Sequence, residues 1–155
     1  YHAHGGFVIG SEFSGGMKNI VVRNNTFQGT DAGLRFKSAV KRGGKSENIY
    51  IDHIYMTDIT GDAITFETTY FDNHVGAKQQ AAPVKQEFLP DFQDIHISNV
   101  YVRGCKNGIV AHGAEGMIHD ITIKDSNIFY NKNAKDIDAA CKITLENVNF
   151  STFAK

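Results

Sequence analysis

An apolar motif that recurs five times constrains the fold of this chain more than any other feature of its sequence. Each copy follows an Asn, Asp or Lys with alternating apolar and polar residues, and the copies begin at residues 19, 48, 94, 120 and 142. Repeats at intervals of roughly 20 to 50 residues are typical of solenoids, in which each unit stacks on its neighbours to bury an apolar face. The chain is therefore expected to be one stacked domain.

A second apolar segment follows a turn residue inside four of the units, at residues 6–9, 33–36, 62–66 and 107–111. These segments alternate apolar and polar side chains, as β-strands do, and helical periodicity is almost absent. The pattern predicts an all-β fold, a right-handed parallel β-helix whose coils stack about 4.8 Å apart. Residues 1–155 would form a single partial domain, about five coils of a longer helix. Asn and Asp at the strand edges fit its turns, because both tolerate left-handed backbone conformations.

Two other folds compete with the β-helix. A leucine-rich horseshoe requires a Leu-rich signature, whereas Ile, Val, Phe and Thr dominate the motif copies. A β-sandwich of hairpins is also less favoured, because hairpin turns do not recur at fixed offsets along the chain.

One interval between motif copies is longer than the others by about 20 residues, which indicates a loop insertion. We expect it at about residues 71–91, where Pro83, Pro90 and a Gln79-Gln80 pair break the strand alternation. The insertion would extend from the coil without interrupting the stack.

Composition excludes two classes of partner. The formal net charge is −1, with 16 Lys and Arg against 17 Asp and Glu. Nucleic-acid binding depends on a clustered excess of Lys and Arg, so we expect no nucleic-acid partner. No apolar run approaches the roughly 20 residues that a membrane span requires, so we expect no membrane partner either.

Cysteine and histidine positions leave smaller questions open. Cys105 and Cys141 could form one disulfide or remain two buried thiols, because they fall at different offsets in the repeat. His2 and His4 form a His-x-His pair, but no third ligand stands at a suitable spacing. We therefore expect neither a metal ion nor another cofactor.

Arg35 and Lys37 stand two residues apart, with Leu34 and Phe36 at the alternate positions. Strand periodicity places both cations on one face, which is either an ordinary solvated surface or the floor of a carboxylate-binding cleft. Strands aligned in register would create two outward ladders. One contains Val8, Arg35, Thr65 and Val110, and the next contains Gly10, Lys37, Glu67 and His112.

Residues 4–12, followed one coil later by residues 33–38, resemble family 28 glycoside hydrolases, the polygalacturonase family. In that family a Gly-His-Gly segment ending in Ile-Gly-Ser precedes an Arg-Ile-Lys segment. This chain has Ala3-His4-Gly5 and, with one extra glycine, Ile9-Gly10-Ser11, followed by Arg35-Phe36-Lys37. Tyr70, after the strand that ends at Glu67, also resembles a tyrosine of the family. The likeness covers essentially the whole chain.

The resemblance implies inverting hydrolysis of α-1,4-linked galacturonate, in which one aspartic acid protonates the leaving oxygen and other aspartates activate water. It implies that Arg35, Lys37 and Tyr70 bind substrate and that His4 hydrogen-bonds and tunes the catalytic acid. The family's catalytic aspartates lie in an Asn-Thr-Asp segment and an Asp-Asp pair, and both precede the His-Gly segment. Neither occurs in these 155 residues. We therefore expect the C-terminal portion of a pectin-degrading enzyme, inactive by itself.

The same resemblance implies a pectic, galacturonate-containing polysaccharide of the cell wall as the partner, and a secreted or periplasmic location. Coil ends left open by truncation would favour self-association. Two alternatives remain. A non-catalytic β-helix module could bind anionic polysaccharide through Arg35 and Lys37. A β-helical pectate lyase would instead need a calcium site built from clustered carboxylates, which the outward ladders do not offer.

Overall fold

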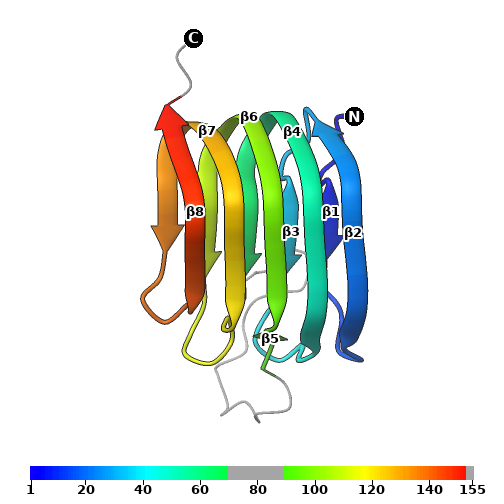
Figure 1. The fold of residues 1–155 in the computed structure, drawn as a ribbon. Coiled ribbons are helices and arrows are strands. Elements are labelled where there is room, and N and C mark those ends of the chain that lie inside the picture. Colours follow the sequence, from blue (N-terminus) through cyan, green and yellow to red (C-terminus); the bar gives the residue numbers. More distant parts are fainter. Residues whose placement is uncertain (70–88, 153–155) are drawn as a thin grey trace, which may run out of the picture.

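The computed structural model describes residues 1–69 and 89–152, and it contains eight strands and no helix within them. The strands form one parallel sheet that winds around the molecule (Figure 1). Their bounds are β1 (Phe7–Ile9), β2 (Met17–Gln28), β3 (Leu34–Lys37), β4 (Lys45–Glu67), β5 (Asp91–Phe92), β6 (Ile95–His112), β7 (Ile121–Ile137) and β8 (Ile143–Thr152).

The five motif copies stack in register, as the repeat predicts. Their first isoleucines pair in sequence along the stack, in the order Ile20, Ile49, Ile95, Ile121 and Ile143. This winding of parallel strands is a right-handed parallel β-helix, which confirms the predicted fold class. Neither the hairpins of a sandwich nor the helices of a leucine-rich horseshoe occur among the described residues.

The long strands bend between two layers. Figure 1 shows β2, β8 and the first parts of β4, β6 and β7 side by side in front, with β1, β3 and the later parts of β4, β6 and β7 behind. Polar residues with a left-handed backbone recur at matching positions of the coils: Asn19, Asn48, Asp94 and Asp120 at one position, and Asn24, His53, Asn99, Asp125 and Asn147 five residues later. Asn and Asp tolerate this conformation, as expected for the strand edges.

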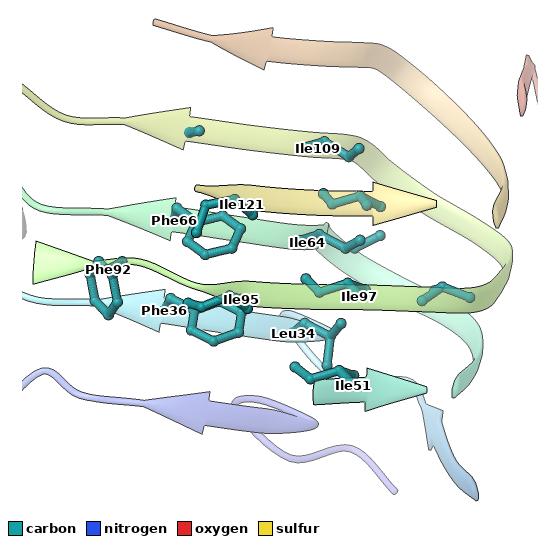
Figure 2. Close-up of a cluster of buried hydrophobic side chains, with 14 of the residues drawn as sticks. Leu34, Phe36, Ile51, Ile64, Phe66, Phe92, Ile95, Ile97, Ile109 and Ile121 are labelled. Carbon is teal, nitrogen blue, oxygen red and sulfur yellow. The ribbon is translucent and has the colours of Figure 1, made fainter. Parts of the chain in front are cut away.

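The core fills the space between the two layers. Phe36 and Phe66 are fully buried and stack with ring centroids 4.4 Å apart, and Phe92 packs edge-on against both. Figure 2 shows these three rings gathered at one end of the cluster, with rows of isoleucine at the other. Because like residues stack on like residues, each coil buries the apolar face of the next.

Two smaller expectations concern the cysteines and the insertion. Cys105 and Cys141 are separate, buried thiols with no disulfide between them, and burial raises the pKa of Cys105 to about 12. Most of the expected insertion, residues 71–88, lies outside the described residues. At its end Asp91 already pairs with Lys45, so the stack has resumed by that residue.

Candidate functional site

His4 lies between an acidic side chain, Asp31, and a basic side chain, Arg35, on the outer surface of the β-helix. Its Nδ1 is 2.9 Å from Oδ2 of Asp31, and its Nε2 is 2.9 Å from a guanidinium nitrogen of Arg35. Asp31 stands in the turn before β3, 27 residues from His4. Stacking brings them together, because the backbone N–H of Asp31 donates to the carbonyl of Ala3 in the preceding coil.

The contacts define which nitrogen of His4 carries the proton. A guanidinium can only donate hydrogen bonds, so Nε2 of His4 must accept from Arg35. The proton then resides on Nδ1, which donates to the carboxylate of Asp31. This is the neutral tautomer, held at both ends, and it fixes the plane of the imidazole on an otherwise exposed side chain.

Asp31 is stabilised as a carboxylate in this arrangement. The hydrogen bond from His4 chiefly lowers the pKa of Asp31 below its ordinary value, and a hydrogen bond donated by Thr60 and the charge of Arg35 lower it further. Burial opposes these effects only in part. Asp31 therefore remains an anion that orients His4 and does not serve as a proton donor near neutral pH.

Strand β3 presents Arg35 and Lys37 because its alternate residues are anchored in the core. Leu34 and Phe36 are fully buried, so the two cations between and after them face outward. The neighbouring coil approaches closely at Gly10, where a Cβ atom would lie 1.7 Å from the carbonyl oxygen of Lys37. Gly10 also has φ of +98°, so glycine is required there on both counts.

The predicted ladders form in register. Val8, Arg35, Thr65 and Val110 pair in sequence, and so do Lys37, Glu67 and His112. Gly10 falls just beyond the end of β1 and is not in the paired register. His112 stands near two acids one coil further on, with its ring nitrogens 3.4 Å from Asp136 and 3.3 Å from Asp138.

A cavity of about 200 Å³ lies beside Arg35. Its lining combines the guanidinium with two residues of the next coil, the buried Thr65 and the half-buried Glu67, and with two acids, Asp31 in the turn before β3 and Asp62 in β4. The cavity therefore offers the donors of one guanidinium together with the acceptor oxygens of three carboxylates, which can hydrogen-bond the hydroxyl groups of a ligand.

The structure therefore brings His4 and Arg35 together, and it places Lys37 on the same outward face of β3. Tyr70 lies outside the described residues. Asp31 is the residue that sequence reasoning missed, since its position indicated only a turn. A signal was present in its spacing, because Asp31 follows His4 by one repeat length and so falls one coil away.

Within the described ranges, no group of three His, Cys, Asp or Glu side chains is arranged to hold a metal ion. The same residues include no helix long and apolar enough to cross a bilayer.

Comparison with known proteins identifies relatives of this chain. It is 27% identical over 150 residues to a polygalacturonase of Ralstonia nicotianae, a match that covers 90% of this chain and 26% of the relative. It is 30% identical over 102 residues to an exo-poly-alpha-D-galacturonosidase of Dickeya chrysanthemi, covering 66% of this chain and 16% of the relative. The chain thus spans about a quarter or less of these curated relatives.

A solved structure agrees with the sequence relatives. The hyperthermoactive exopolygalacturonase from Thermotoga maritima superposes with a TM-score of 0.80 and 32% identity, over 96% of this chain and 31% of that protein. Residues 2–147 match the family described as Glycosyl hydrolases family 28. The chain that places His4 against Arg35 therefore belongs to family 28 of the glycosyl hydrolases.

Proposed function

We propose that this chain forms one wall of a galacturonan-binding cleft in a pectin-degrading hydrolase of the polygalacturonase type. The contact between His4 and Arg35, on the face to which β3 also directs Lys37, is the observation that carries the proposal. Relatives named for polygalacturonan supply the substrate class.

The chemistry of the substrate suits these side chains. Galacturonate carries a carboxylate on each sugar, and Arg35 offers a planar pair of donors while Lys37 offers a point charge. Because Arg35 also donates to His4, the imidazole holds the guanidinium in place before substrate arrives. The entropy lost on binding is smaller when the binding group is held in advance.

His4 acts in this proposal as a positioning residue. Inverting hydrolysis needs one acid to protonate the leaving glycosidic oxygen, and a second carboxylate to take a proton from the water whose oxygen bonds to the anomeric carbon. His4 performs neither step, because Asp31 and Arg35 engage both of its nitrogens. His4 could form a hydrogen bond with the reacting acid only if it gave up its contact with Asp31 or with Arg35.

We propose that the 155 residues alone do not hydrolyse polygalacturonate, because the family's Asn-Thr-Asp and Asp-Asp segments are absent from them. Incubation of the chain with polygalacturonate should release no reducing ends above a blank. Measurable hydrolysis would show that carboxylates within this chain carry the reaction.

Substrate binding can be tested separately from hydrolysis. We expect Arg35→Ala to weaken tetragalacturonate binding at least about tenfold in calorimetry, the scale of a lost charged hydrogen bond. Arg35→Lys should restore part of the affinity, since lysine keeps the charge without the planar fork. Arg103→Ala is the matched control, because Arg103 is an exposed cation on β6 that lines neither the cavity beside Arg35 nor the groove of the front layer. Equal losses in Arg35→Ala and Arg103→Ala would overturn the proposed cleft.

A non-catalytic module that binds anionic polysaccharide is the second candidate, and the same outward cations favour it. The full-length protein decides between the two. Hydrolysis that falls in kcat/KM with Arg35→Ala supports the enzyme, whereas binding without hydrolysis supports the module.

We also propose that the protein is secreted or periplasmic, where a polymeric substrate would be met. Cell fractionation with an antibody against this chain tests the location. Self-association through the coil ends stays a prediction, to be checked by size-exclusion chromatography.

A further inference from the structure

A second hollow lies on the front layer of the β-helix, away from β1 and β3 (Figure 1). It is a groove of about 610 Å³ that crosses strands β2, β4, β6, β7 and β8. Five stacked strands span roughly 19 Å, so the groove is long enough for a linear ligand that runs along the solenoid axis. None of the residues assigned to the galacturonan cleft lines it.

One side of the groove is an aromatic platform. Tyr50 and His96 are neighbours in register and stack with ring centroids 4.9 Å apart and planes 20° apart. The side chain of Asp94 contacts Nε2 of His96 at 2.9 Å, which holds the imidazole in place. Tyr50 remains 47% exposed despite the stack, beside Val21, which is 59% exposed. Solvent-exposed aromatic side chains of this kind offer a ligand an apolar surface with a polar rim.

The other side is a row of polar residues in which charges of opposite sign are neighbours. In register along the stack it reads Arg23, Asp52, Ser98, Lys124 and Glu146. Asp52 is held in position by Ser98 and Asn99, which donate to its Oδ1 at 2.9 and 2.8 Å. The row therefore presents hydrogen-bond donors and acceptors in turn, with little net charge.

The charges select against an anionic chain. Among the lining residues, the cations Arg23 and Lys124 stand beside the carboxylates of Asp52, Asp125 and Glu146. A polyanion lying in the groove would bring its carboxylates against these acids, and like-charge contacts oppose binding. A neutral oligosaccharide meets no such repulsion, and its hydroxyl groups can hydrogen-bond to both the donors and the acceptors of the groove.

We propose that this groove is a second binding site, which takes a neutral glycan chain along the solenoid axis. The sugar rings contact the exposed parts of the stacked Tyr50 and His96 side chains, and their hydroxyls hydrogen-bond to the polar row from Arg23 to Glu146. The site is independent of the galacturonan cleft in both position and ligand charge, so either proposal can fail without the other.

The test uses the whole 155-residue chain, labelled with ¹⁵N, and titrates it with cellotetraose, β-1,4-galactotetraose and maltotetraose. At least one of these neutral probes should shift the amide signals of the groove strands, and Tyr50→Ala should weaken that probe's binding at least about tenfold. Tyr55→Ala is the matched control, because Tyr55 is an exposed tyrosine on the same strand that does not line the groove. Tyr50→Phe keeps the ring and should retain most of the affinity.

Tetragalacturonate is the anionic comparison ligand in the same titration. The proposal is overturned if tetragalacturonate shifts the groove signals at lower concentration than any neutral probe. It is also overturned if all three neutral probes leave these signals unmoved up to about 10 mM, beyond the millimolar range of weak but specific binding. A Tyr50→Ala variant that fails to fold would be recognised by the collapse of its dispersed signals, and the comparison of neutral and anionic probes on the parent chain would then decide the test.

Discussion

Two outward faces of the same solenoid differ in how their charges are arranged. On β3, Arg35 and Lys37 occupy successive outward positions, so two positive charges lie together. On the front layer, Arg23 and Asp52 are neighbours in register, and so are Lys124 and Glu146. The backbone ladders are alike, and Glu67 stands beside Lys37 in register on the next coil, but β3 carries two cations in succession along one strand and the strands that line the groove do not.

The difference teaches how a β-helix separates folding from recognition. Inward residues are mainly isoleucine, with phenylalanine and other apolar side chains between them, and their packing holds the coils together. Outward residues are spaced by the same backbone at about 4.8 Å from coil to coil, whatever their chemistry. A change of sign at one outward position can therefore change the preferred ligand without a change of fold.

The largest expected effect comes from breaking the part that the two faces share. Phe36→Ala should lower the free energy of unfolding by about 3–5 kcal/mol, because it opens a cavity beside Phe66 in the core. Urea denaturation measures the loss, and both ligands should be lost together when the coils no longer stack. Val21→Ala, at an exposed position, should change the stability by no more than about 0.5 kcal/mol. A Phe36→Ala variant as stable as Val21→Ala would contradict the shared core.

Added salt should weaken ligand binding at one face more than at the other, and this effect is smaller than the loss caused by Phe36→Ala. Raising the ionic strength shortens the range of charge interactions, from about 10 Å at 0.1 M to about 3 Å at 1 M. Tetragalacturonate binding at Arg35 should therefore weaken several-fold, whereas binding of a neutral tetrasaccharide in the groove should stay nearly constant. Calorimetry at the two salt concentrations checks this, and equal salt dependence would remove the distinction between the faces.

The smallest expected effect is a change in the titration of Asp31. His4→Ala removes the hydrogen bond that chiefly lowers the pKa of Asp31, so that pKa should rise towards its ordinary value of 3.8. A depressed carboxyl pKa stabilises the fold above the unfolded-state pKa, and this stabilisation is lost as pH falls through the folded-state value. The variant should therefore lose less stability than the parent chain on acidification below about pH 4.

Carboxyl ¹³C signals followed by NMR against pH give the pKa of Asp31 directly. His53→Ala is the control, since His53 contacts Asp52 and not Asp31. An unchanged Asp31 titration in His4→Ala would mean that the contact between the two side chains does not persist in solution.

Much of the cleft could be predicted because it follows from the repeat. The spacing of the motif aligned Arg35 with Thr65 and Lys37 with Glu67, and the structure pairs them in that register. Asp31 was beyond this reasoning, because a turn residue has no alternation to show where its side chain points. Its contact with His4 depends on where the turn before β3 passes the preceding coil.

The groove on the front layer could not be predicted in the same way. Its residues are visible in the sequence, but Tyr50 and His96 are 46 positions apart and the insertion lies between them. Only the aligned coils show that the two rings stack, and only the structure shows that Asn99 and Asp125 line a hollow with them.

The sequence by itself determined the β-helix, because alternation decides which side chains are buried and the repeat decides which residues stack. It also identified His4, Arg35 and Lys37 as a group. The tertiary structure decided which nitrogen of His4 carries the proton, that Asp31 stays a carboxylate beside it, and where the second groove lies. These depend on side chains from different coils meeting at hydrogen-bond distance, and a linear pattern records which coil a residue occupies but not where its side chain ends.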